Sequence, residues 1–393
     1  MRLRQRTKMI ALLVSLLLVI SFGLANKKDN IQEDVPNDDA VIDTIPETYK
    51  GLINDKYNVP TDIINVITNY MDAYFKSIYT LELQDTKDYF VNELDGQVSD
   101  AAIKLIVETR KLYDFDFTMS DAHYDLNIIN YSNSGDKYYV DFLEDDYFCF
   151  KFLNGISSET YDVENYIVIE KVNDEYKISE YEKVQGYYMM FNDNKDDGEI
   201  ESVYQFYYDR LKATIEDELY KKQLAQTNPY VANKVFNVKY DRDAAAKYAN
   251  SYYHTRNEEY YDFSDEGGNC QNFASQTLKA GGMIMDDSGD CNWYYYDHLD
   301  YVPSWVHVSS FYDYCRDNEG TGLATDINNN IYYAELGDLI QVGISSISHT
   351  TIVSKVVDGH ILLNSNSIDM KDFPLEAYTY PTRKLIKILG SNN

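Results

Sequence analysis

A single cysteine at the predicted start of a helix is the residue of this sequence best placed to do chemistry. Cys270 follows two glycines and Asn269, and apolar residues such as Phe273 and Leu278 come after it at helical spacing. Asparagine is a favoured N-cap, so Cys270 is expected to be the first residue of the helix. Unpaired backbone N–H groups and the helix dipole favour an anion there, which lowers a thiol pKa and can hold an oxyanion during acyl transfer. A buried structural cysteine fits the same pattern, since free cysteines are among the most buried residues.

A cysteine nucleophile needs a base, and His349 is the strongest candidate among the six histidines. It follows a loop rich in glycine and serine and precedes the apolar stretch 350–354. His349 is therefore expected at the mouth of a strand, where the backbone fixes the side chain while its tip stays accessible.

A predicted hairpin offers a third group that could orient this base. Asp358-Gly359 is a two-residue turn signal, which predicts that Val357 pairs with His360. In that register the side chain of Asn366 points to the same face as His349 and lies diagonally within reach of its ring.

The same register assigns weaker roles to two neighbours of Asn366. Asn364 lies on the same face but one pair further along, and Ser367 points to the opposite face. A slip of one residue would reverse these faces. The alternative interpretation is that the histidine is a surface strand residue and the asparagines belong to a loop.

Two helices followed by several strands are expected before residue 192. The helical periods cover residues 60–79 and about 99–112, and the strand-like stretches are 138–142, 147–152, 166–170 and 176–179. An N-terminal α+β domain over residues 46–192, of the nuclear-transport-factor-like cone type, fits this order of elements.

A charged helix of about residues 199–226, within a linker of residues 193–236, is expected to join this domain to a second one over residues 237–393. The second domain begins with a helix near 241–253, continues with the Cys270 helix, which Gly281-Gly282 ends, and finishes with strands. This order is typical of a papain-like α+β core.

The length and net charge of the chain limit the number of domains and the kinds of partner that we expect. The 393 residues suffice for two domains, and a formal net charge of −30 argues against a nucleic-acid partner. Four cysteines are too few for a disulfide-rich scaffold and have no metal-ligand spacing, although Cys291 and Cys315 could pair in an oxidising exterior.

The first residues have the pattern of a secretion signal. Basic residues within 2–8 precede the apolar run Met9–Phe22, and Gly23-Leu24-Ala25 offers small residues for cleavage. We therefore expect a signal peptide over residues 1–25, a flexible spacer over 26–45, and a secreted or cell-surface protein. The alternative is an uncleaved membrane anchor, for which the apolar run is short.

Residues 237–391 resemble the bacterial putative amidase domain of the papain-like cysteine peptidase and amidase group. The matching stretches are 240–249, 261–263, 267–276, 293–294, 304–306, 337–341, 349–353 and 374–375. The resemblance implies that Cys270 is the nucleophile and His349 its base. The chain departs from the family at Asn269, where an acidic residue is usual, and at Asn366, where histidine is frequent. Asparagine can still orient the base, as in papain-like sites.

These features predict an exported cysteine amidase that forms a thioacyl-enzyme and needs no cofactor or metal. Asn269, Trp293 and Trp305 are assigned to substrate binding, with core packing as the alternative for the tryptophans. Peptidoglycan stem peptides are the expected substrate if the protein is exported. The alternatives are a protease of exported polypeptides and an inactive module that binds the cell wall or a protein.

Overall fold

The computed structural model describes residues 51–393 with the exception of 196–197, 233 and 289–290. The predicted signal peptide and spacer lie outside the described residues. Within them, no helix is long and apolar enough to cross a membrane.

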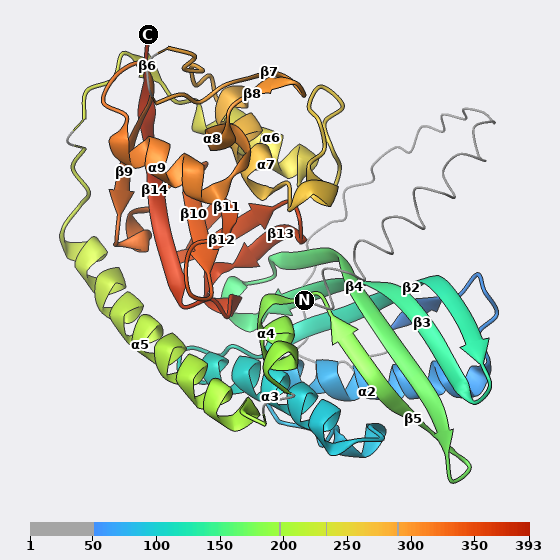
Figure 1. Ribbon diagram of the computed structural model, residues 1–393. Helices are drawn as coiled ribbons and strands as arrows, with labels where there is room; N and C mark the ends of the chain where they lie inside the picture. The colour runs from blue at the N-terminus through green and yellow to red at the C-terminus, as the bar shows by residue number, and fades with distance from the viewer. Residues whose placement is uncertain (1–50, 196–197, 233, 289–290) are drawn as a thin grey trace, which may run out of the picture.

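The N-terminal part consists of two helices packed on a curved antiparallel sheet (Figure 1). Its helices are α2 (Thr61–Thr80) and α3 (Glu93–Arg110), and its strands are β2 (Met119–Ser134), β3 (Lys137–Phe150), β4 (Ser157–Val172) and β5 (Glu175–Lys183), with the short β1 (Leu52–Asn54) parallel to β2. The predicted helices and strands are present, but the stretches 138–142 and 147–152 form the single strand β3. α3 begins earlier than predicted, because the Asn92 side chain accepts a hydrogen bond from the backbone N–H of Asp95 and caps it.

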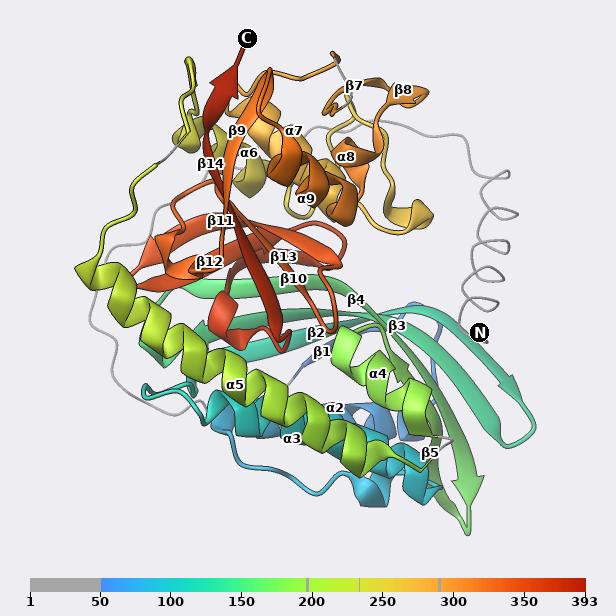
Figure 2. The same ribbon diagram turned by 60° about the vertical axis from the view of Figure 1, so that its left-hand side comes forward.

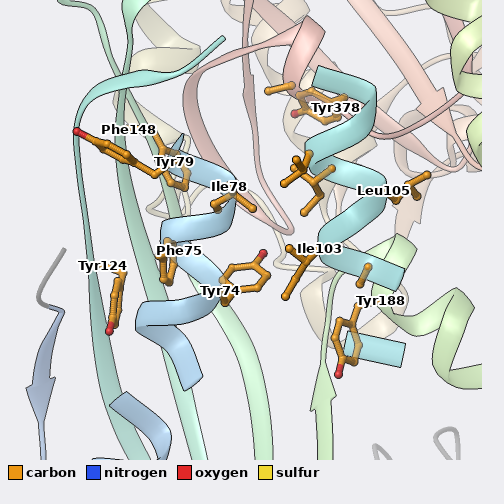
Figure 3. Packing of buried hydrophobic residues seen from close by; sticks show 14 of the residues in the cluster. Tyr74, Phe75, Ile78, Tyr79, Ile103, Leu105, Tyr124, Phe148, Tyr188 and Tyr378 are labelled. Carbon is orange, nitrogen blue, oxygen red and sulfur yellow. The ribbon is translucent and has the colours of Figure 1, made fainter. Parts of the chain in front are cut away.

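The helical period of α2 buries one face of that helix against the sheet. Figure 3 shows Tyr74, Phe75 and Ile78 of α2 directed into the core, where the ring of Phe75 stacks on Tyr124 with centroids 4.2 Å apart. Each such side chain contributes about 1.5–3 kcal/mol through burial.

Two helices lead from the N-terminal part to the C-terminal part. These are α4 (Gly186–Asn194) and α5 (Ile200–Thr227), and α5 runs along the side of the molecule (Figures 1 and 2). The charged helix predicted for about residues 199–226 is present as α5. Its buried Glu218 accepts a hydrogen bond from the guanidinium of Arg383 at 2.8 Å, which fastens the helix to the last strand.

In the C-terminal part, helices pack over an antiparallel region of sheet. The helices are α6 (Arg242–Tyr252), α7 (Cys270–Ala280), α8 (Pro303–Val306) and α9 (Val308–Asp317). The strands are β6 (Val238–Lys239), β9 (Gly322–Asn328), β10 (Leu339–Gly343), β11 (His349–Val357), β12 (His360–Ser365), β13 (Asp369–Pro374) and β14 (Thr382–Asn392), and β7 (Tyr295–Asp297) and β8 (Asp300–Tyr301) form a separate hairpin.

One mixed sheet runs through both parts. Its order is β1-β2-β3-β4-β13-β12-β11-β10-β14-β6, with β5 paired to β4 and β9 paired to β14. The junction is the antiparallel pairing of β13 with β4, from Asp369 opposite Tyr161 to Lys371 opposite Glu159. Figure 2 shows α6, α7 and α9 at one end of the molecule and α2 and α3 at the other, with β4, β12 and β13 between them. The fold is α+β, as predicted, while the papain-like core, the cone-type domain and the domain boundaries stay predictions.

The sequence left open whether Cys291 and Cys315 pair, and the described residues contain no disulfide between them. Cys315 of α9 is buried in the apolar core of the C-terminal part. The framework of the C-terminal part therefore depends on packing and hydrogen bonds rather than on a disulfide.

Candidate active site

Cys270 is the first residue of α7, as the sequence predicts, and Asn269 is its N-cap residue. The two preceding glycines have φ angles of +109° and +117°, a region in which side chains with a Cβ are strained. Gly267 and Gly268 thus let the chain turn sharply into α7 and present Cys270 at the helix start.

Burial opposes ionisation of the Cys270 thiol. The residue is only 7% exposed, and burial raises the pKa of the thiol above its ordinary value. Backbone N–H groups of Thr350, Gln271 and Cys270 itself act in the opposite direction but more weakly. The predicted lowering of the pKa is therefore wrong, because the desolvation of the sulfur outweighs the N–H groups at the start of the helix.

His349 is the first residue of β11 and pairs with Val342 at the end of β10, as expected for a strand mouth. The expectation that the tip of the ring stays accessible is wrong, because Nε2 is buried and has no hydrogen-bond partner. Burial lowers the pKa of the ring to about 4. The imidazole is therefore neutral at neutral pH and keeps an unused nitrogen for a proton.

Thr350 brings the start of β11 against the start of α7. Its backbone N–H contacts the Cys270 thiol, and its hydroxyl donates to Oε1 of Gln271 at 2.8 Å. Because Thr350 directly follows His349, the cysteine and the histidine predicted from sequence lie in the same region of the structure.

A buried amide pair behind the cysteine was not predicted from the sequence. Nε2 of Gln341 lies 3.5 Å from Oε1 of Gln271 and donates to the carbonyl of Val308 at 3.0 Å. Gln341 is fully buried in the middle of the apolar stretch 339–343. A polar residue at such a position was the signal that could have identified it, since buried amides need partners.

A β-bulge overturns the register from which Asn366 was assigned to His349. The Asp358-Gly359 turn forms and pairs Val357 with His360, as predicted. The register then shifts by one residue between Val353 and Lys355, so that Asn364 lies opposite Ile352.

Asn366 orients the loop of the nucleophile rather than the base. Its Oδ1 accepts a hydrogen bond from Nδ2 of Asn269 at 2.8 Å, and its Nδ2 donates to the carbonyl of Tyr252 at 3.1 Å. These contacts use both the oxygen and the nitrogen of the Asn366 side-chain amide. The assignment of Asn366 to the ring of His349 is therefore corrected.

Asn269 is enclosed by the protein. It is 3% exposed, its Oδ1 accepts from Nδ2 of Asn272 at 2.7 Å and from the N–H of Phe263 at 3.3 Å, and its Nδ2 is used by Asn366. It makes no side-chain hydrogen bond to the backbone of α7. Its predicted role in substrate binding does not fit this geometry, since its polar atoms are committed within the protein.

Ser367 is a site residue that the predicted register placed on the wrong face. Its hydroxyl accepts a hydrogen bond from the backbone N–H of Asn269, and its own N–H donates to Oδ1 of Asp369 at 2.9 Å. Ser367 and Ile368 have φ angles of 81° and 84°, a strained region for such side chains. A strained turn between β12 and β13 therefore holds the residue that precedes the nucleophile.

An ion-pair cluster anchors that turn at the junction with the N-terminal part. Arg256 donates to both carboxylate oxygens of Asp369, at 3.0 and 3.3 Å, and His254 Nδ1 lies 3.3 Å from the same group. Asp162 of β4 completes a group whose ligand atoms lie within 4.8 Å of one another. The guanidinium already neutralises Asp369, so the cluster is better described as an ion-pair network than as a cation site.

Trp293 and Trp305 are core residues, contrary to their assignment to substrate binding. Both are fully buried and stack with ring centroids 4.9 Å apart. Nε1 of Trp305 donates to Oδ1 of Asn272 at 2.9 Å, and Nε1 of Trp293 to Oγ of Ser275 at 3.1 Å. The tryptophans are hydrogen-bonded to side chains of α7 within the core and do not form an exposed wall.

The C-terminal part matches a known family of domains. Residues 239–389 match the putative amidase domain family. The family resemblance expected from the sequence is thereby confirmed, and it covers the segment that carries Cys270 and His349. A hydrolase acting on amides is the activity that this family suggests.

An uncharacterized protein, YhbB of Bacillus subtilis (strain 168), is similar to this chain with 33% identity over 139 residues. The match covers 34% of this chain and 43% of the relative, so the chain spans less than half of that protein. No solved structure matches the chain significantly.

Proposed function

We propose that the C-terminal part is a cysteine-dependent amidase with Cys270 as nucleophile and His349 as base. The observation that carries the proposal is the contact of Thr350, the residue after His349, with the thiol at the start of α7. A nucleophile beside helical N–H groups and a histidine with an unused ring nitrogen are the parts that acyl transfer needs.

The proposed reaction starts from a neutral thiol and a neutral imidazole. His349 takes the thiol proton as the sulfur attacks the carbonyl carbon, and the carbonyl electron pair moves to oxygen near the N–H groups of Cys270 and Gln271. The tetrahedral intermediate collapses to a thioester while the imidazolium protonates the leaving amine. Water, deprotonated by His349, then hydrolyses the thioester and restores the thiol.

Replacement of the nucleophile is the first test of this proposal. We expect Cys270→Ala to abolish hydrolysis and to keep the fold, because a methyl group cannot attack a carbonyl and the change removes a single atom. The assay is mass spectrometry of the products formed from purified cell wall and from a peptide library, with circular dichroism as the check on folding.

A labelling experiment supplies the matched control. A thiol-reactive probe should label Cys270 in competition with substrate, and Cys149→Ala, which removes the half-buried thiol of β3, should leave that competition unchanged. Hydrolysis by the Cys270→Ala variant at the normal rate would contradict the assignment.

Export and a cell-wall substrate are further parts of the proposal. They rest on the basic and apolar pattern of residues 2–25 and not on the site itself. Sequencing the N-terminus of the protein recovered from outside the cell tests the first part, and Met1 on membrane-extracted protein would favour an anchor. Release of amino acids or peptides from purified peptidoglycan tests the second.

An inactive binding module is the second candidate function. The specific observation in its favour is the burial of Cys270, which raises the pKa of its thiol instead of lowering it. Failure of Cys270 to react with a small alkylating reagent at neutral pH, in folded protein, would favour this alternative.

A further inference from the structure

A cavity lies where the N-terminal part meets the C-terminal part. It has about 80 Å³ of free space, enough for more than one water-sized group. Its walls include Tyr74 and Ile78 of α2, Phe148 of β3 and Tyr378 of the C-terminal part, all of which Figure 3 labels around α2 and α3. The proposed reaction uses none of these residues.

A buried arginine without an acidic partner lines this cavity. Arg110, the last residue of α3, is 6% exposed, and its Nη1 donates to the carbonyl of Ile78 at 3.2 Å. Its Nε is buried without a hydrogen-bond partner. Among the described residues, the groups whose charge acts on Arg110 are the tyrosine hydroxyls of Tyr187, Tyr74 and Tyr113, and none is a carboxylate. Burial lowers the pKa of Arg110 only to about 10, so the group is charged at neutral pH.

The surroundings compensate this charge only in part. The carbonyl of Ile78 belongs to the C-terminal end of α2, which favours a cation, and the guanidinium lies 5.3 Å from the ring of Phe117 and 5.5 Å from that of Phe150. A buried cation without a counter-ion remains costly, and a guanidinium matches a carboxylate through two parallel hydrogen bonds.

A second group of the cavity suits the same kind of ligand. Oδ2 of Asp146 accepts a hydrogen bond from the hydroxyl of Thr160 at 2.7 Å, while its Oδ1 is buried without a partner. Burial and the nearby Glu144 raise the pKa of Asp146 well above its ordinary value. A protonated carboxyl carries no charge and therefore does not repel an anion in the cavity.

We propose that this cavity binds a short-chain carboxylate, with its head group on Arg110 and its alkyl tail against Ile78, Phe148 and Ile368. The free space of about 80 Å³ suits a small ligand. Ile368 also belongs to the strained turn whose Ser367 holds Asn269. The ligand therefore lies against the element that positions the loop of the nucleophile.

Butyrate and its neutral analogue butyramide test the proposal on the unmodified full-length chain. Titration followed by saturation-transfer NMR and by calorimetry should show binding of butyrate, with butyramide at least about tenfold weaker, because hydrogen bonds to a charged group are the stronger ones. Equal affinity for the two compounds, or no binding of butyrate, would overturn the proposal.

Variants of the arginine locate the binding site. Arg110→Met should weaken butyrate binding by at least about tenfold, Arg110→Lys should retain part of it, and Arg316→Met, which removes an exposed arginine of α9, should change nothing. Undiminished binding by folded Arg110→Met protein would also overturn the proposal. If this variant does not fold, the comparison of butyrate with butyramide decides the question without it.

Discussion

Cys270 and His349 both carry a charge less readily in the folded protein than in water. Burial raises the pKa of the thiol and lowers that of the imidazole to about 4. A thiolate–imidazolium pair is therefore not the resting state of the free protein, and the proton must move during the attack itself.

This arrangement predicts a broad plateau in the pH profile of hydrolysis. The acidic limb of kcat/KM should follow His349 and lie near pH 4 rather than near 6.5, because only the neutral ring accepts the thiol proton. The rate should therefore stay constant as the pH falls from 7 to about 5. An acidic limb near pH 6.5 would contradict the buried, neutral histidine.

Burial of His349 also predicts that the protein becomes less stable as the pH falls. The unfolded ring has a pKa near 6.5 and the folded ring one near 4, so between these values the unfolded chain binds the extra proton. His349 should thus lower the free energy of unfolding as the pH falls from about 6.5 to 4 and have no such effect above 7. Urea unfolding of the wild type and of His349→Gln at pH 7.5 and 5 measures the difference, which should shrink or vanish in the variant.

At the scale of elements, the turn between β12 and β13 holds the loop that presents the nucleophile. Asn366 and Ser367 each bond to Asn269, one through the side-chain amide and one through the backbone N–H. Ser367 and Ile368 have positive φ angles, so the backbone of this turn is strained where it makes these two contacts. The carboxylate of Asp369 accepts a hydrogen bond from the N–H of Ser367 in this turn and is itself bound by the guanidinium of Arg256.

Loss of the Ser367 hydroxyl should disturb the Cys270 loop. Ser367→Ala leaves the N–H of Asn269 without its acceptor, which costs about 1–3 kcal/mol of stability. We expect kcat to fall more than KM rises, because the contact positions the reacting group and does not bind substrate. Thermal unfolding and steady-state kinetics measure the two effects.

The exposed Ser309 of α9 provides the control for this variant. Ser309→Ala removes an equivalent hydroxyl away from the turn and should leave stability and kinetics unchanged. If Ser367→Ala had no more effect than Ser309→Ala, the turn would not position the nucleophile.

The sequence predicted the local features of the hairpin but not its distortion. Asp358-Gly359 predicted the turn correctly, since both residues need positive φ angles that these types tolerate. At the bulge near Ser354, the carboxylate of Asp372 in β13 accepts a hydrogen bond from the Ser354 hydroxyl at 2.8 Å and also binds Lys355. The hairpin is thus bonded to a third strand at its bulge, and a local pattern does not reveal such a contact.

At the scale of the whole molecule, the two parts share a sheet and a core. The helices α2, α5, α6 and α7 were predictable because their apolar periods and end signals are local. The pairing of β13 with β4 joins residues about 200 positions apart, and no periodicity encodes such a contact. Ser158 of β4 also donates to the carbonyl of Asp372 at 2.7 Å across this junction.

Separation of the two parts should destabilise the part that carries the candidate active site. A fragment of residues 237–393 would expose the edge of β13 and the side of the core formed by Phe373, Leu375 and Tyr378, which belong to the same apolar cluster as α2 and α3. We expect it to aggregate or to lose cooperative unfolding, as measured by size-exclusion chromatography and thermal circular dichroism.

A cut chain that keeps both parts is the control for the fragment. A protease site inserted beside Val231, which is 73% exposed between α5 and β6, should allow cleavage of the folded protein without separation of the halves, because the sheet and the core still join them. The cleaved protein should therefore unfold near the temperature of the intact one. A monomeric 237–393 fragment with cooperative unfolding and full hydrolytic activity would instead establish two independent domains, and the shared sheet would then be a docking contact rather than a structural requirement.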